Sequence, residues 1–305
     1  MNNAAAVARQ MWTLFEPVHV VSYFTPEARA AFEEAGLHGF WRGYFAGRAA
    51  PMGQAGAPPV VAAFFVFAPT MVERAIPGVW DLVTQAEALA ARQTGAVAAV
   101  RRLLGLKSGD IVPAAVSAVS DELAAAAGNL DGAGRALAAC NIALPVPDEP
   151  VARLWHAATL LREHRGDGHV AALVAADLDG AEALALRAGL DRISGGGSGH
   201  VAAGWKREQM QPVRGWTDAQ WDAADERLTA RGLLGGDRAA TPAGVALHRE
   251  IEHSTDQAAA RPWTSLGQDR VAALVRLLQP IARACAAAMP FPNPVGVSAP
   301  ADLIS

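Results

Sequence analysis

Apolar residues recur every three to four positions along much of this chain, which is the spacing of one face of an α-helix. Over residues 6–24 this face contains Met11, Leu14, Phe15, Val18 and Val21. Comparable patterns predict helices over 38–48, 70–75, 78–104 and 111–128. Residues 60–67 could form either a buried strand or a buried helix, because an unbroken apolar run has no period. We therefore predict a mainly α-helical protein with little β-structure.

The composition is that of a folded chain without a surplus of positive charge. Of the 305 residues, 51% are apolar and 18% are charged, which leaves room for one large domain or two ordinary ones. Acidic residues outnumber basic ones by 30 to 26. Proteins that bind nucleic acid through its phosphates usually have a basic surface, and no overall basic excess exists here.

Signals for export or membrane insertion are not apparent. The N-terminal segment MNNAAAVARQMW lacks the basic and apolar regions of a signal peptide. The apolar run 57–72 is interrupted by prolines and is shorter than the roughly 20 residues of a membrane span. Cys140 and Cys285 form neither a CxxC pair nor a disulfide framework. We therefore expect a cytoplasmic protein without a membrane partner.

A proline-rich segment, NIALPVPDEP at 141–150, predicts a boundary between two domains. These are a helical half at 1–145 and a second half at 150–289, followed by an extended tail at 290–305 with four prolines.

The two halves partly repeat. Trp12 and Trp155 each begin a helix that is followed by a polar turn and a second helix, and Trp80 has a counterpart in Trp216. An ancient duplication would explain this, and chance similarity between two Ala-rich helical halves is an alternative of equal weight.

The second half contains a recognisable module. Thr217-x-x-Gln220 is a capping box, the helix after it ends near Gly232, and Gly235-Gly236-Asp237 predicts a short β-hairpin. Thr241-Pro242 then starts a long helix. This order over residues 216–260 resembles the winged helix of MarR-type regulators.

A wider set of segments carries a second resemblance. They are LFEPVHVVSYF, GYFAGRAAPMG, LWHAATLLREHRGDGHVAAL and IEHSTDQAAARPW. Together they are similar to the SalK-like family of actinobacterial proteins over nearly the whole chain. This resemblance implies a shared fold and does not imply a reaction.

The helix expected to read DNA is acidic. It carries the carboxylates Asp218, Asp222, Asp225 and Glu226 against Arg227 and Arg231. Carboxylates at this position repel phosphates, so duplex DNA is not expected as a partner. A winged helix used for packing or for forming a homodimer is favoured instead.

The densest polar segment is 162–169, which follows an apolar helix. Glu163, His164, Asp167 and His169 are the candidate catalytic residues, because a histidine beside a carboxylate can transfer protons. Arg162 and Arg165 are expected to pair with these carboxylates and to contact a ligand. Gly166 and Gly168 would let the backbone turn and bring the segment to the main cavity. A solvated helix end is an alternative of equal weight.

A second polar group lies in the first half. Glu16, His19 and Tyr23 share one helix face, and Arg48 ends another helix. Aromatic residues such as Trp41 and Tyr44 surround them, which is typical of an apolar ligand cavity. A satisfied core histidine is the competing interpretation.

Motifs for metals and common cofactors do not stand out. His248, Glu252 and Asp256 have a spacing that metals accept, but this spacing is common on solvated helices. The glycine-rich run 195–199 is expected to be a loop, because no phosphate-binding motif surrounds it. We predict neither a metal nor a cofactor.

These patterns favour a protein that binds a small, largely apolar molecule between helices, as a sensor or a sequestering protein. The alternative is a cofactor-independent enzyme that uses segment 162–169 for acid–base chemistry. A winged-helix transcription regulator is a third, weaker alternative.

Overall fold

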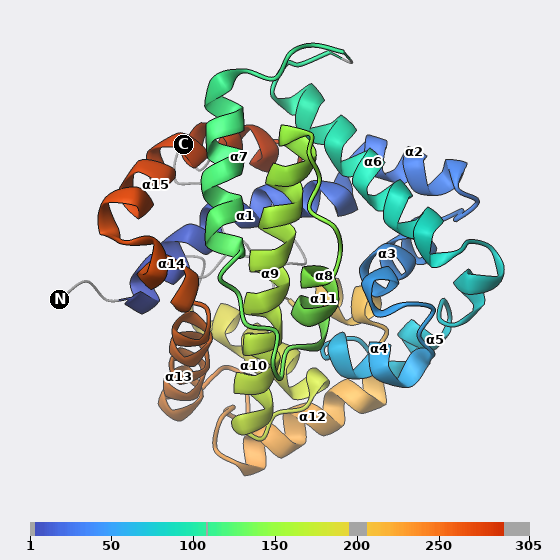
Figure 1. The fold of residues 1–305 in the computed structure, drawn as a ribbon. Coiled ribbons are helices and arrows are strands. Elements are labelled where there is room, and N and C mark those ends of the chain that lie inside the picture. The colour runs from blue at the N-terminus through green and yellow to red at the C-terminus, as the bar shows by residue number, and fades with distance from the viewer. Residues whose placement is uncertain (1–3, 108, 195–205, 290–305) are drawn as a thin grey trace. The chain divides into compact units, whose positions relative to one another are not determined.

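A computed structural model describes residues 4–107, 109–194 and 206–289, and the regular structure within these ranges is helical (Figure 1). The longer helices are α1 (Ala4–Phe24), α2 (Pro26–Glu34), α3 (Phe40–Ala49), α6 (Gln85–Leu103), α7 (Ala114–Ala127), α9 (Pro150–Ala175), α10 (Gly180–Ser194), α11 (Arg207–Arg214), α12 (Asp218–Ala230), α13 (Pro242–Ala258) and α15 (Gln268–Ala286). Shorter helices are η1 (Ala50–Met52), α4 (Ala57–Ala63), α5 (Pro69–Glu73), η2 (Gly78–Asp81), α8 (Ala136–Ile142) and α14 (Arg261–Leu266). The predicted mainly α-helical fold is confirmed.

Several local predictions are also resolved. The ambiguous run 60–67 begins in α4 and continues as a turn, so it is not a strand. Thr25 caps α2 through the Ala28 backbone N–H, as its sequence predicts. None of the described helices is both long and apolar enough to cross a membrane. The predictions for 195–199 and 290–305 fall outside the described residues.

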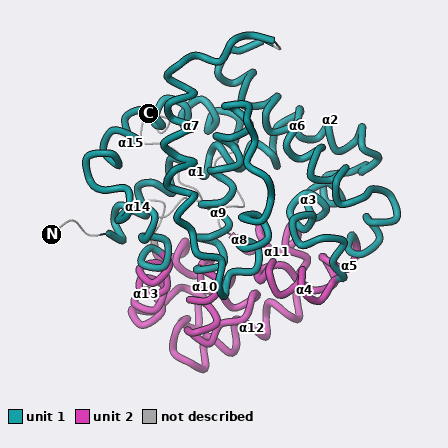
Figure 2. Tube along the Cα trace, in the orientation of Figure 1, with its two compact units in different colours: residues 1–56, 75–168, 256–290 teal, residues 57–74, 169–255, 291–305 magenta. Residues whose placement is uncertain are grey.

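The chain divides into two compact units whose segments alternate along the sequence (Figure 2). Unit 1 comprises residues 1–56, 75–168 and 256–290, and unit 2 comprises the remainder. Helix α9 begins at Pro150, the last residue of the segment 141–150, and its residues are shared between the two units, so the halves expected on either side of that segment remain a prediction.

Unit 1 is a bundle of helices around an apolar core. Its buried residues come from α1, α6, α7, α9, α14 and α15, and include Phe15, Trp155 and Leu278. Helix α1 packs against α15 and α6, and α2 packs against α6. The α2–α6 contact is close at Gly95, where a Cβ atom would lie 2.6 Å from the Cα of Ala28.

Unit 2 combines an early segment of the chain with a later group of helices. Trp221 and Leu228 of α12 form its core with residues of α10. Residues 57–74 pack against these helices, and the Trp216 Nε1–H donates a hydrogen bond to the Val66 carbonyl at 3.0 Å. At the start of α10, a Cβ on Gly180 would lie 2.1 Å from the Phe65 carbonyl oxygen, so this position requires glycine.

Helices α11 and α12 are joined by a short turn, which is the order of elements in a helix-turn-helix pair. The turn is Gly215–Thr217, with Gly215 in the left-handed region at a φ of 77°. The predicted capping box is confirmed: Thr217 accepts a hydrogen bond from the Gln220 N–H, and the Gln220 side chain accepts one from the Thr217 N–H.

The predicted wing hairpin is wrong. In the described part of the chain the segment after α12 forms a single antiparallel bridge between Leu234 and Ala240 instead of paired strands. The N–H groups of Leu233 and Leu234 both bond to the Leu228 carbonyl of α12, and Thr241 already caps α13, so these residues are not available for a ladder of strand hydrogen bonds.

The predicted turn at 165–168 is also wrong, because these residues lie inside the continuous helix α9. Gly168 serves close packing instead of a bend: a Cβ there would lie 2.7 Å from Nη1 of Arg135. Arg135 donates hydrogen bonds across this position to the carbonyls of His164 and Ala258.

Candidate functional site

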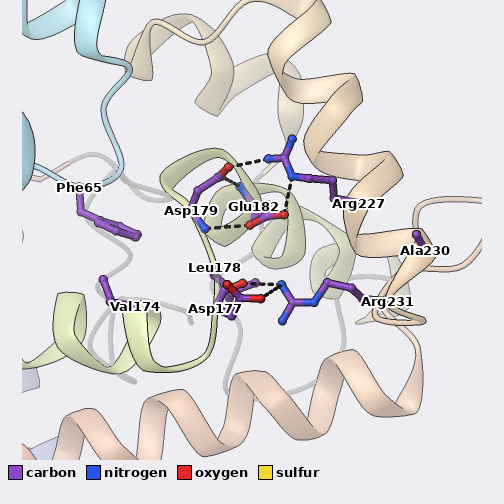
Figure 3. A pocket seen from close by; sticks show the side chains of 9 residues that line it. All are labelled: Phe65, Val174, Asp177, Leu178, Asp179, Glu182, Arg227, Ala230 and Arg231. Atoms are coloured by element: carbon purple, nitrogen blue, oxygen red, sulfur yellow. Dashed lines mark hydrogen bonds and ion pairs between the residues drawn. The ribbon is translucent and has the colours of Figure 1, made fainter.

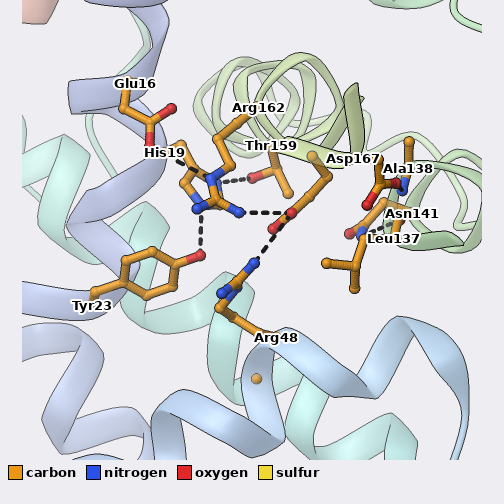
Figure 4. A network of polar contacts seen from close by, with 12 residues as sticks. Glu16, His19, Tyr23, Arg48, Leu137, Ala138, Asn141, Thr159, Arg162 and Asp167 are labelled. Atoms are coloured by element: carbon orange, nitrogen blue, oxygen red, sulfur yellow. Dashed lines mark hydrogen bonds and ion pairs between the residues drawn. The ribbon is translucent and has the colours of Figure 1, made fainter. Parts of the chain in front are cut away.

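Unit 1 contains a buried network of polar side chains from three helices (Figure 4). Its members are Glu16, His19 and Tyr23 of α1, Tyr44 and Arg48 of α3, and Thr159, Arg162 and Glu163 of α9. The sequence predicted seven of these eight residues as candidates, and the fold brings them together as a single network.

Two glutamates and two arginines form the ionic part of the network. Arg162 donates to Glu163 at 2.7 Å and approaches Glu16 at 3.4 Å. Arg48 reaches the same Glu163 oxygen at 3.4 Å and donates to the Tyr44 hydroxyl at 3.0 Å. The formal charges of these four groups cancel, so their ion pairs leave no net charge among them.

The two glutamates respond differently to burial. Burial alone would raise the pKa of Glu163, but the guanidiniums of Arg162 and Arg48 outweigh it and lower this pKa to about 2. Burial raises the pKa of Glu16, an effect opposed by Arg162 and by the hydrogen bond from Trp12. Glu163 is therefore a weak base, which gives little support to the enzyme alternative.

His19 lies between two hydroxyl groups. Its Nδ1 is 2.9 Å from the Thr159 hydroxyl, and its Nε2 is 2.6 Å from the Tyr23 hydroxyl. Since the Thr159 hydroxyl donates to the Trp155 carbonyl, it accepts from Nδ1–H, and Tyr23 then donates to Nε2. Burial, with Arg162 second, lowers the pKa of His19, which agrees with this neutral tautomer.

Asp167 lies one helical turn beyond Glu163. Its Oδ2 accepts a hydrogen bond from the Ala138 backbone N–H at 2.9 Å. Burial raises its pKa to about 6, because this hydrogen bond offsets only part of the desolvation.

The remaining predicted residues lie outside the network. Trp41 packs against the ring of Tyr44. Arg165 pairs with Asp256 at 2.7 Å and lies over the Trp12 ring. Burial and the adjacent Arg135 lower the pKa of His164 to about 4.

His169 belongs to unit 2, where its Nδ1 lies 2.9 Å from the Thr255 hydroxyl. Within the described ranges, no group of three or more His, Cys, Asp and Glu side chains is placed to hold a metal ion.

The cavity expected among the aromatic residues of the first half is narrow. A cleft beside Tyr23, Phe40 and Tyr44 has a volume of about 20 Å³, which is room for roughly one water molecule. Segment 162–169 does not line it.

Unit 2 contains a larger cleft of about 670 Å³ (Figure 3). Its apolar lining residues are Phe65, Val174, Leu178 and Ala230, and its charged ones are Asp177, Asp179, Glu182, Arg227 and Arg231. The volume lies within the range of small-molecule sites, and the cleft opens widely to solvent. Segment 162–169, which was predicted to border the main cavity, does not line this cleft either.

Arg227 of α12 is held by two carboxylates at the start of α10. It donates to Asp179 at 2.5 Å and to Glu182 at 2.8 Å. Asp179 and Glu182 also form a capping box. The side chain of each residue accepts a hydrogen bond from the backbone N–H of the other residue at 2.8 Å. Arg231 donates to the carbonyls of Ala176 and Asp177 beyond the end of α9.

Sequence reasoning missed this cleft. Asp179-x-x-Glu182 has capping-box spacing, and this signal could have located the start of α10. The contribution of Phe65 has no signal in the sequence, because it comes from a segment more than 100 residues away.

A family model described as a helix-turn-helix family matches residues 8–292. No curated protein and no solved structure matches the chain. The expected membership of the SalK-like family, with a MarR-like winged helix, is therefore wrong, because the matching model is the helix-turn-helix one and the wing is absent from the described residues.

Proposed function

Since the chain belongs to this helix-turn-helix family, we propose that it is a transcription regulator. The family match carries the proposal, because it spans both units and includes the α11–α12 pair. Helix-turn-helix regulators place the second helix of the pair in the major groove of DNA. In this proposal, that helix is α12. The acidic residues of α12 led to the expectation that DNA is not a partner. Family membership favours the regulator over that expectation.

The charges near α12 limit how this helix could hold DNA. Asp218, Asp222 and Glu226 are exposed, and Arg207 is paired with the first two at 3.0 and 2.5 Å. Arg227 is tied to Asp179 and Glu182. A DNA-contacting helix whose nearby arginines are paired in this way releases few counterions when it binds.

The salt dependence of binding follows from this arrangement. If phosphates draw Arg227 away from Asp179 and Glu182, and Arg231 contacts a second phosphate, the logarithm of the binding constant falls with the logarithm of the salt concentration with a slope of about −1.8. The affinity then falls about tenfold from 50 to 200 mM salt. Proteins with six to ten phosphate contacts lose about 10³- to 10⁵-fold over the same range.

Selection of duplexes from a random pool by the purified full chain tests the proposal. We expect one enriched sequence whose affinity has this shallow salt dependence. The double variant Asp179→Asn/Glu182→Gln keeps the capping hydrogen bonds but releases Arg227, so it should bind the selected duplex more tightly. Glu250→Gln, an exposed change on α13, is the control. Absence of enrichment at 50 mM salt with both the native chain and the double variant would reject the regulator.

Small-molecule binding is a second candidate, and the volume of the cleft in unit 2 favours it. The network of unit 1 is a less suitable site, because its carboxylates and guanidiniums pair with one another and the adjacent cleft holds roughly one water molecule. An effector in the unit 2 cleft would touch Arg227 and Arg231 at the end of α12.

A further inference from the structure

We propose that the cleft in unit 2 binds an amphiphilic cation, an aliphatic or aromatic group that carries a primary ammonium. This inference rests on the proposed small-molecule role and assigns its chemical class. The site consists of an apolar side and a charged side that meet in a single cleft (Figure 3).

The apolar side suits a hydrocarbon group. Phe65 and Val174 lie together at one end of the cleft in Figure 3, away from the arginines. Both side chains are partly exposed, so a ligand can remove apolar surface from water there. The face of the Phe65 ring can also attract a cation.

The charged side has an excess of negative charge. Three carboxylates line it, those of Asp177, Asp179 and Glu182, against the guanidiniums of Arg227 and Arg231. The formal charge of these five groups is therefore −1, which a ligand with one positive charge neutralises. An anionic ligand would add to the excess.

Asp177 is the carboxylate best placed to receive the ammonium. Its side chain is 98% exposed, and its contact with Arg231 is long at 3.9 Å. Asp179 and Glu182, in contrast, are engaged by Arg227 and by the capping box. Two nitrogens of each guanidinium, those of Arg227 and of Arg231, already donate to protein acceptors, so an anion could bind these groups only by displacing those acceptors.

The backbone holds these groups in place before a ligand arrives. Asp177 has a φ of 54°, in the left-handed region that Asp and Asn tolerate better than most residues. Close packing of Gly180 against the Phe65 carbonyl fixes the two sides of the cleft relative to each other. Such preorganisation reduces the entropic cost of binding.

Calorimetry with three eight-carbon probes tests the inference on the full chain. We expect n-octylammonium to bind with 1:1 stoichiometry and at least threefold more tightly than octanol, and octanoate to bind more weakly than octanol. Asparagine tolerates the left-handed backbone conformation of residue 177 as aspartate does, so Asp177→Asn removes only the charge. This variant should reduce octylammonium affinity about three- to fivefold, as for an exposed ion pair. Phe65→Ala should weaken all three probes, whereas Glu250→Gln should change none.

Tighter binding of octanoate than of octylammonium, or unchanged octylammonium affinity in Asp177→Asn, would overturn the proposal. Failure of all three probes to bind would do the same. These measurements contain no DNA, so they remain separate from the duplex selection: enrichment of a sequence without octylammonium binding rejects only the ligand class.

Discussion

Glu163 and Asp167 lie one turn apart on the same helix, and their pKa values shift in opposite directions. Replacing each with its amide should therefore change stability with opposite signs at neutral pH. The Glu163→Gln and Asp167→Asn pair isolates this effect, because both changes remove one carboxylate and nearly preserve its shape.

The magnitude for Glu163 follows from its pKa, which falls from 4.5 to about 2 in the folded protein. A depressed pKa contributes stability above pH 4.5 that is lost as the pH falls toward 2, and here it amounts to about 3 kcal/mol. Glu163→Gln also leaves Arg48 and Arg162 without their shared carboxylate, so the cost near pH 7 should be about 3–5 kcal/mol.

The stability contributed by Asp167 depends on pH in the opposite direction to that of Glu163. Its pKa rises from 3.8 to about 6, so the stability present below pH 3.8 is lost as the pH rises through 6. This loss is about 3 kcal/mol at pH 7. An asparagine can still accept the hydrogen bond from Ala138, so Asp167→Asn should be more stable than the native chain by about 2–3 kcal/mol at pH 7.5.

Urea unfolding followed by circular dichroism, at pH 7.5 and at pH 4, measures both differences. Glu163→Gln should lose stability at pH 7.5, and the loss should shrink at pH 4. Asp167→Asn should gain stability at pH 7.5, and the gain should fall to about 0.5 kcal/mol at pH 4. If both variants are destabilised by the same amount at pH 7.5, the assignment of opposite shifts to these two carboxylates is refuted.

Three further outcomes are expected. Gly180→Ala should destabilise unit 2 by about 1–3 kcal/mol or more, because its Cβ would collide with the Phe65 carbonyl, and an unchanged melting temperature would contradict this. Tyr23→Phe should cost about 1–3 kcal/mol by removing the donor to His19; a nitrogen NMR spectrum of the native chain showing the Nε2–H tautomer would contradict the assignment. Thr217→Ala should cost about 1 kcal/mol through loss of its helix cap, measured by urea unfolding, and a cost below the error of that measurement would argue against the cap.

The sequence predicted those features that depend on residues close together in the chain. The apolar period identified α1, and the capping signals at Thr25 and Thr217 located the starts of two helices. The shared face of Glu16, His19 and Tyr23 followed from helical spacing alone, and the His19–Tyr23 contact agrees with it. Caps and helical faces are set by neighbours within about four residues, so local patterns are sufficient for them.

Only the tertiary structure decided which of these faces meet. Arg48 and Glu163 are 115 residues apart, and no local pattern pairs them. The glycines of segment 162–169 suggested a turn, but Gly168 instead makes room for Arg135, which arrives from another part of the chain. Phe65 likewise joins the cleft of unit 2 through packing of residues 57–74. Helical periodicity specifies that a face is buried but not its partner, because the partner is selected by the fit and charge of surfaces that are distant in sequence.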